Sequence, residues 1–240
     1  LHRLIYEMGT SMSLDIHIKL DTGMHRLGFL EHEIPELIQV LHHHKQIKVV
    51  SIFSHLAASD QADFDEFTLI QKSRFDAMTH QLIQSLGYKP MLHLINSSGI
   101  SRHPHLQYDM VRLGIGLYGI DSDQHMFSML EKVHTLKTRI SQINEIKEGE
   151  TVSYNRSGKV YKNSKIAVLS LGYADGLPRN ISKNKYCVAI RKHKAPIIGV
   201  VCMDMTMVDV SHIEGVKVGD EVEIFGITST IEQLAKAAET

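Results

Sequence analysis

The chain has 240 residues, 43% of them hydrophobic and 22% charged, so it is long enough to bury one large core or two moderate ones. Its formal net charge of −1 argues against nucleic-acid binding and against a polybasic membrane contact, because both need a basic surface. Two cysteines provide no disulfide framework and the sequence has no long apolar run, so we expect a cytoplasmic protein without membrane segments.

The first predicted strand spans residues 14–20, where apolar and polar side chains alternate. The run ends in a turn at Gly23, and a helix is predicted from Pro35 onward because apolar residues recur there at helical spacing. The tract 42–44 contains three histidines, but consecutive helical residues point in different directions, so we predict a solvated helix end and no metal site. A strand, a loop and a helix in this order are typical of a parallel barrel, whose polar groups near the strand end serve a site.

Three more strands are predicted, at residues 48–56, 91–95 and 110–118. A long helix lies between the first two of these strands, with Asp63 as the expected N-cap and Gly87 as the expected end. Four strands separated by helical connections make half of an eight-stranded (β/α) barrel, which we assign to residues 1–127.

From Glu131 onward the sequence changes to short alternating runs bounded by turn residues, a pattern typical of a mostly β domain. We place the boundary between Asp121 and Leu130 and assign residues 128–240 to this domain. The predicted fold class is therefore α/β plus β, the C-terminal half of a (β/α)8 TIM-like barrel followed by a mostly β domain. The chain begins without methionine and stops within a predicted helix, so we expect a fragment of a longer protein.

Seven stretches, in order along nearly the whole chain, resemble motifs of bacterial alanine racemases, which use pyridoxal 5'-phosphate (PLP). They are residues 19–28 (Lys-Leu-Asp-Thr-Gly-Met-His-Arg-Leu-Gly), 54–60, 96–98, 112–119, 152–156, 172–179 and 201–210. The resemblance implies PLP-dependent interconversion of L-alanine and D-alanine for peptidoglycan synthesis. It also implies a homodimer in which the β domain of one subunit completes the active site of the other.

By this resemblance, Tyr154 is the catalytic residue that removes or returns the α-proton on one face of the substrate. A phenol with a reference pKa of about 10 is a poor base, so it needs a neighbouring hydrogen bond or positive charge. Arg112 matches the arginine that faces the pyridine nitrogen of PLP, where it can donate a hydrogen bond but not readily a proton. The ring is then a weaker electron sink, which suits racemisation. A structural ion pair between Arg112 and Asp109 is the alternative.

The other cofactor-binding residues that the resemblance implies are His55, Asn96, Ser97, Gly114 and Ile115. Backbone N–H groups and a hydroxyl at barrel loops give neutral donors for the cofactor phosphate. The implied substrate-binding residues are Arg26, Met203, Asp204 and, at the entrance, Tyr173. Lys19 matches a lysine that is carbamylated in several family members, and the resulting anion would pair with Arg26.

The chain also departs from the family pattern. Residues 181–186 replace a loop that usually contains glycine, and Val200 stands where arginine is common. The Lys-x-Asn-Ala-Tyr-Gly stretch that carries the PLP lysine does not occur in the sequence, so we expect the isolated chain to be inactive. Two other interpretations stay open, a non-catalytic dimerisation or scaffold fragment and a PLP-dependent amino-acid decarboxylase of the same fold. A fusion to a cell-wall ligase and the use of serine as a substrate are also left open.

Overall fold

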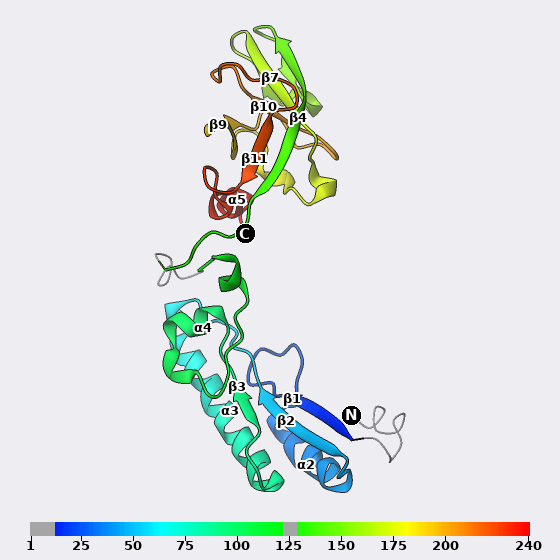
Figure 1. The fold of residues 1–240 in the computed structure, drawn as a ribbon, viewed down its shortest axis with the longest axis vertical. Coiled ribbons are helices and arrows are strands. Elements are labelled where there is room, and N and C mark those ends of the chain that lie inside the picture. The colour runs from blue at the N-terminus through cyan, green and yellow to red at the C-terminus, as the bar shows by residue number, and fades with distance from the viewer. Residues whose placement is uncertain (1–12, 122–128) are drawn as a thin grey trace. The chain divides into compact units, whose positions relative to one another are not determined.

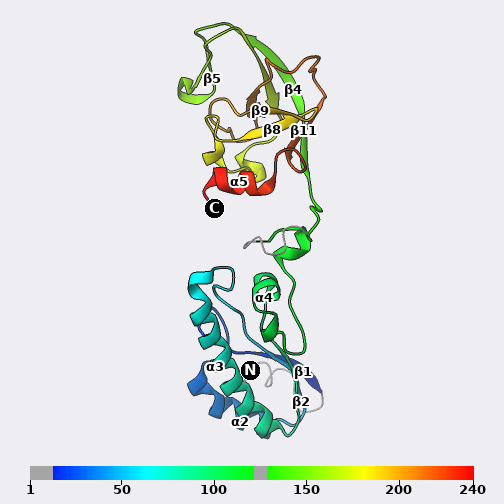
Figure 2. The ribbon, with the colours of Figure 1, turned by 90° about the vertical axis from the view of Figure 1, so that its left-hand side faces the viewer.

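The computed structural model describes residues 13–121 and 129–240 (Figures 1 and 2). The chain divides into two compact units, Leu1–Glu131 (unit 1) and Lys132–Thr240 (unit 2), which we describe separately. Among the described residues, none of the helices combines the length and the apolar character that a membrane crossing requires.

Unit 1 is built on a parallel sheet of three strands in the order β1 (Leu14–Lys19), β2 (Ile47–Phe53) and β3 (Met91–His93). The strands alternate along the chain with α2 (Ile34–His43) and α3 (Asp65–Leu86), and Figure 1 shows both helices beside the sheet. Apolar side chains from the sheet and the two helices form one buried core, which includes Ile18, Ile34, Leu37, Ile52, Phe75, Met78 and Leu82. The strand, helix, strand order of unit 1 is the order that the hydrophobic pattern predicts.

Helix α3 ends as predicted but begins differently. Its C-cap is Gly87, whose φ of 72° is left-handed and therefore favours glycine. The prediction that Asp63 caps the N-terminus is wrong, because Asp63 lies inside a 3-10 turn (Ala62–Phe64) and Phe64 holds the cap position without a side-chain hydrogen bond.

The predicted fourth strand, residues 110–118, is also wrong. After the short helix α4 (Ser97–Arg102), the chain returns to β3 without forming a strand, through a parallel bridge between His93 and Met110 and hydrogen bonds of Asp109 to Leu92. Beyond that bridge the chain forms a 3-10 turn, Ile115–Tyr118. The main-chain N–H groups at positions 114 and 116 donate to a serine hydroxyl instead of to a neighbouring strand, and this removes the donors that a strand would need.

Unit 2 is dominated by one antiparallel sheet. Its strands are β4 (Leu136–Ile146), β7 (Ser164–Leu169), β8 (Cys187–Ile190), β9 (His193–Pro196), β10 (Thr206–Asp209) and β11 (Glu221–Phe225), in the order β10-β7-β4-β11-β8-β9. The two ends of this order meet, since Ile197 and Val208 form a bridge and Ile198 N–H donates to the carbonyl of Met207 at 2.9 Å. The six strands therefore close into a barrel.

Two further elements complete unit 2. A short hairpin pairs β5 (Thr151–Val152) with β6 (Gly158–Lys159). Helix α5 (Ile231–Ala238) begins at Thr230, whose hydroxyl accepts the N–H of Gln233 as an N-cap.

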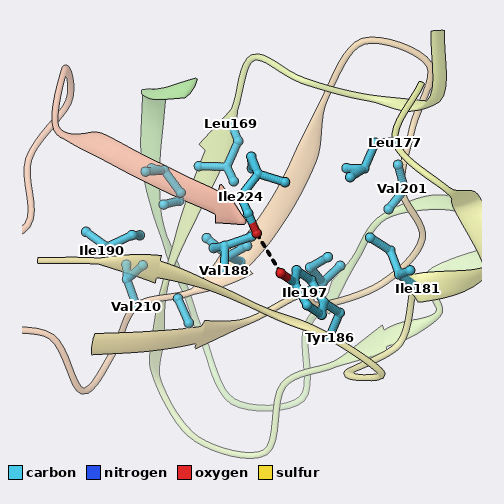
Figure 3. Packing of buried hydrophobic residues seen from close by; sticks show 14 of the residues in the cluster. Leu169, Leu177, Ile181, Tyr186, Val188, Ile190, Ile197, Val201, Val210 and Ile224 are labelled. Carbon is cyan, nitrogen blue, oxygen red and sulfur yellow. Dashed lines mark hydrogen bonds between the residues drawn. The ribbon is translucent and has the colours of Figure 1, made fainter. Parts of the chain in front are cut away.

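The core of unit 2 consists mainly of branched aliphatic side chains and one buried phenol (Figure 3). Tyr186 is 4% exposed, and its hydroxyl donates to the carbonyl of Ile224 at 2.7 Å. Burial raises the pKa of Tyr186, so the hydroxyl keeps its proton and remains a donor. In the preceding loop, Lys183 and Asn184 have φ of 60° and 64°. Glycine adopts this left-handed geometry most readily, and here a lysine and an asparagine adopt it.

Candidate active site

Main-chain carbonyls and histidine rings surround the guanidinium of Arg112. One nitrogen donates to the carbonyls of Ser54 and Leu94, at 2.5 Å and 3.2 Å, and lies 3.3 Å from His55 Nδ1. The other terminal nitrogen contacts His93 Nδ1. Burial lowers the pKa of Arg112, yet an arginine still keeps its charge near neutral pH. The guanidinium is thus fixed in one orientation by several acceptors.

Asp109 has other partners. Its carboxylate accepts from Lys89 Nζ at 3.0 Å and from the N–H of Leu92 at 2.8 Å. Both oxygens of the carboxylate are therefore paired with groups other than Arg112, and the alternative of an ion pair between Asp109 and Arg112 is not supported.

A line of hydrogen bonds continues from Arg112 across the parallel sheet to β1. An arginine only donates, so His93 Nδ1 must accept and the ring carries its proton on Nε2. His93 Nε2 lies 3.2 Å from Ser51 Oγ, which lies 2.6 Å from His17 Nδ1. The sequence motifs did not indicate His93 or Ser51. Strand alternation, which places every second side chain on the same face, was the available signal.

The protonation of His93 gives a testable pH dependence. Burial, then the charge of Arg112 and then that of His17 lower the pKa of His93 to about 4, against about 6.5 for an unfolded histidine. As the pH falls below 6.5 the unfolded chain binds a proton that the native ring refuses, so the free energy of unfolding should decrease. The full loss, reached near pH 4, should be about 3 kcal/mol.

We expect the free energy of unfolding of unit 1 to be lower at pH 4.5 than at pH 7.5. The measurement is urea unfolding followed through the amide NMR signals of α3. The carboxylates of the unit contribute to the same trend, so the matched comparison is His93→Gln. This variant should lose less stability between the two pH values. Equal losses in the variant and the wild type would contradict the assignment.

Positive charge gathers around His55. After burial, the charges of Arg112, Arg26 and Lys19 lower the pKa of His55, so these three cations act on the same ring. The imidazole is therefore kept neutral. An electropositive region of this kind suits an anion, such as the carboxylate of an amino acid.

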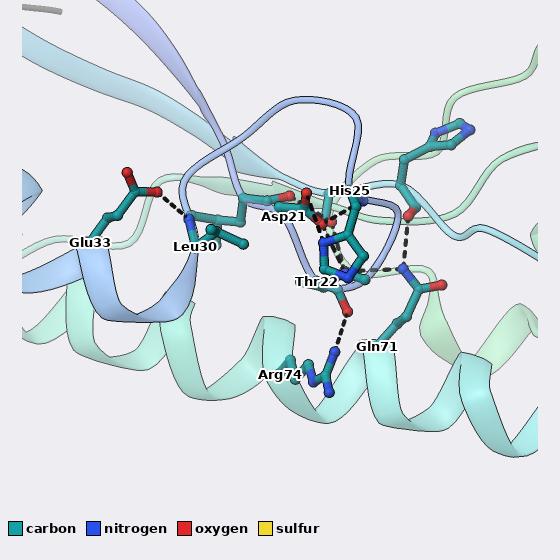
Figure 4. A network of polar contacts seen from close by, with 11 residues as sticks. Asp21, Thr22, His25, Leu30, Glu33, Gln71 and Arg74 are labelled. Atoms are coloured by element: carbon teal, nitrogen blue, oxygen red, sulfur yellow. Dashed lines mark hydrogen bonds and ion pairs between the residues drawn. The ribbon is translucent and has the colours of Figure 1, made fainter.

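The loop that follows β1 is braced against α3 (Figure 4). Asp21 Oδ1 accepts two main-chain N–H bonds from the turn that follows it, at 2.9 Å and 3.0 Å. Burial would raise the pKa of Asp21, but these N–H groups hold it below the ordinary value. Gln71 Nε2 and Arg74 donate to the hydroxyl and the carbonyl of Thr22, both at 3.3 Å. The contacts of Asp21 and Thr22 thus fix the loop that carries Arg26.

The turn before α4 brings a hydroxyl and several amides together. Asn96 caps the helix by accepting the N–H of Gly99 at 3.0 Å. Ser97 Oγ accepts the N–H groups of Gly114 and Gly116, at 2.9 Å and 3.1 Å. The two amides are paired with Ser97 Oγ, and the Ser97 O–H remains a neutral donor that suits a phosphate group in its chemistry. The turn gathers the predicted cofactor-binding residues Asn96, Ser97, Gly114 and Ile115.

In unit 2, Tyr154 opens a 3-10 turn (Tyr154–Arg156), and its side chain is exposed. Three of its neighbours have positive φ, namely Ser153 (73°), Asn155 (56°) and Arg156 (52°). Backbone of this kind costs energy in residues other than glycine, and it is found preferentially at functional sites. The turn that carries the predicted base is therefore conformationally unusual.

One main-chain segment, residues 199–203, holds the loops of unit 2 together. The carbonyl of Cys202 accepts the N–H of Tyr173 at 3.0 Å, and the carbonyl of Met203 accepts the N–H of Ala174 at 2.9 Å. Val200 of the same segment is hydrogen-bonded to Ser153, which precedes the Tyr154 turn. Tyr173, Met203 and Asp204 are all exposed beside it. The structure thus groups the predicted residues of unit 2 on one scaffold.

Two models of one family match the chain. The alanine racemase N-terminal domain matches residues 6–122, and the alanine racemase C-terminal domain matches residues 133–240. The chain belongs to the alanine racemase family. The predicted fold class, part of an α/β barrel followed by a mostly β domain, is confirmed by these matches and by the solved racemase structures below.

The chain is 41% identical over 214 residues to alanine racemase 2 of Caldanaerobacter subterraneus subsp. tengcongensis, a match that covers 88% of this chain and 55% of that relative. It is 37% identical over 219 residues to the alanine racemase of Methanococcus maripaludis, with coverages of 90% and 58%. The chain therefore spans little more than half the length of these curated racemases.

Solved racemase structures also resemble the chain. The alanine racemase of Clostridium difficile 630 matches with a TM-score of 0.85 and 32% identity, over 95% of this chain and 60% of that one. The alanine racemase of D-cycloserine-producing Streptomyces lavendulae matches with a TM-score of 0.87 and 26% identity, with coverages of 95% and 62%.

Proposed function

We propose that the full-length protein containing these 240 residues is a PLP-dependent alanine racemase, which interconverts L-alanine and D-alanine. The observation that carries this proposal is the arginine, not a carboxylate, held by carbonyls and histidines at the end of the parallel sheet. Bound PLP supplies an electron sink that makes the α-proton of an amino acid removable. Arg112 would donate a hydrogen bond to the ring nitrogen while keeping its own proton, which limits side reactions.

The described residues fit the cofactor and the substrate in their chemistry. The Ser97 hydroxyl and the amide of Ile115, next to Asn96, would hold the phosphate, and Gly114 would orient Ser97 through its N–H. His55, neutral among its cations, would lie beside the Arg112 end of the cofactor. We assign the removal or return of the α-proton on one face to Tyr154.

The electropositive region suits the carboxylate of alanine. Arg26 would bind that carboxylate, and Lys19, if carbamylated, would pair with Arg26 and orient it. The residues Met203, Asp204 and Tyr173 would contact the substrate or line its entrance. We propose a homodimer with a shared active site, a cytoplasmic location and a role in supplying D-alanine for peptidoglycan.

The direct test is incubation of the full-length protein with L-alanine or D-alanine, followed by chiral chromatography. Both reactions should give the same racemic mixture, and the activity should depend on added PLP. Reduction with borohydride and peptide mapping should place PLP on a lysine outside these 240 residues. Absence of racemisation with PLP bound, or release of carbon dioxide from a basic amino acid, would overturn the proposal.

A further inference from the structure

The backbone at Ser153 has a conformation that a serine rarely adopts. Its φ of 73° and ψ of 178° lie in a region that is occupied almost entirely by glycine. A conformation of this kind persists only when surrounding contacts hold it. Ser153 directly precedes Tyr154, so the strain is adjacent to the proposed base.

Two hydrogen bonds supply the holding contacts. Ser153 Oγ donates to the carbonyl of Val200 at 2.9 Å and accepts the N–H of the same residue at 3.0 Å. We call this pair of bonds the Ser153 clamp. One side chain thus satisfies both main-chain groups of Val200 and ties the Tyr154 turn to the segment 199–203.

The absence of a side chain at Gly199 lets the two segments joined by the clamp approach each other. A Cβ atom built on Gly199 would lie 2.4 Å from the Cβ of Ser153, and the φ of Gly199 is itself left-handed at 73°. Any other residue at this position would push Ser153 away. Both partners of the clamp are therefore adapted to one close contact.

Tyr154 depends on its backbone for its position. Within the described residues its phenol makes no hydrogen bond, and its side chain is 63% exposed. The turn after it is closed by the N–H of Ser157, which donates to the Tyr154 carbonyl at 3.2 Å, and by Arg156 Nε, which donates to Thr151 Oγ1 at 3.2 Å. The direction of the side chain is consequently set by the dihedral angles on either side of it.

We infer that Ser153 is a positioning residue for the racemase reaction, which holds Tyr154 in its catalytic direction through the two bonds to Val200. This inference rests on the proposed function for its catalytic consequence. The clamp itself is a property of the 240-residue chain. The two parts can therefore be tested separately.

The catalytic part is tested by deuterium incorporation from D2O into the α-position of each alanine enantiomer, using the full-length protein with PLP. Ser153→Ala should slow exchange by about 10- to 100-fold for the enantiomer that Tyr154→Phe also affects, since a small displacement of a reacting group has effects of that order. Exchange of the other enantiomer should stay within about twofold of the wild type, because only one base has moved.

Two further variants separate positioning from a general loss of structure. Ser153→Gly relieves the strained dihedral angles but removes the clamp, so it should fold well and show the same enantiomer-specific loss. Ser157→Ala is the matched control, since it removes a hydroxyl from the same turn that has no hydrogen-bond partner within the described residues. It should exchange both enantiomers at the wild-type rate. Equal losses for both enantiomers, or no loss in Ser153→Ala, would overturn the inference.

The structural part is tested by limited trypsin digestion of the 240-residue chain. Arg156 lies in the exposed turn, and cleavage after it requires the turn to open. Ser153→Ala and Ser153→Gly should be cut there about tenfold faster than the wild type or Ser157→Ala, because the opened turn becomes more populated. Unchanged cleavage in both variants would show that the clamp does not hold the turn. Absence of exchange in the wild type would instead overturn the proposed function and leave this digestion to decide the clamp.

Discussion

Replacement of Tyr154 by phenylalanine in the full-length protein should abolish proton exchange from one enantiomer of alanine while PLP remains bound. The change removes only the phenolic oxygen, and general base catalysis by a positioned side chain contributes on the order of 10²- to 10⁴-fold. Because the side chain is exposed and its hydroxyl has no hydrogen-bond partner among the described residues, the substitution should not affect folding. The measurement is deuterium incorporation into each enantiomer, with PLP retention followed by its absorbance.

Tyr161 provides the matched control for that experiment. It is another exposed tyrosine of unit 2, at 77% exposure, and lies outside the proposed site. Tyr161→Phe should exchange both enantiomers at the wild-type rates. If Tyr154→Phe did the same, Tyr154 could not be the base.

Substitution of Gly172 by alanine should destabilise unit 2 by about 3 kcal/mol, because overpacking against rigid backbone costs 1–3 kcal/mol and occasionally more. A Cβ atom at Gly172 would lie 2.2 Å from the carbonyl oxygen of Met203 and 2.4 Å from that of Cys202. Both are main-chain atoms, so no side chain can rotate away. The clash would separate the loop that begins with Tyr173 from the segment 199–203.

Gly219→Ala is the control for the loss of glycine itself. Gly219 has a φ of 90°, but a Cβ atom there would meet nothing within 4 Å, so the variant should lose only about 1 kcal/mol. Urea unfolding of the 240-residue chain, followed through amide signals of the barrel strands, compares the two. Similar losses in both variants would mean that the contact between the loops relaxes easily.

The sequence predicted the order of the elements because burial imposes a regular spacing on them. The alternation in residues 14–20 produces β1, and Gly87 ends α3 because its φ is left-handed. The prediction of a fourth strand was wrong although its apolar residues have a composition typical of strands. An amide of this segment donates instead to the hydroxyl of Ser97, which lies 17 residues earlier in the chain. Hydrogen bonds between segments distant in the chain are not visible in local periodicity.

The candidate site, like the fold, was predictable from the sequence in part. Family motifs named Arg112, Ser97 and Tyr154, and the structure places the first two among suitable partners. Motifs did not indicate His93, whose part depends on a tertiary contact with Arg112. The strain at Ser153 was equally hidden, because nothing about a serine in sequence announces a dihedral angle that glycine normally occupies.

The segment 199–203 makes its contacts to the loops of unit 2 through main-chain atoms. The carbonyl and N–H of Val200 meet a serine hydroxyl, and the carbonyls of Cys202 and Met203 meet amides. The side chain of Val200 takes no part in these contacts, so this residue can change without moving the loops, whereas Gly199 and the buried Val201 cannot change freely. Protein engineers could vary the side chains of Val200 and Met203 while the main-chain geometry of the loops is inherited unchanged.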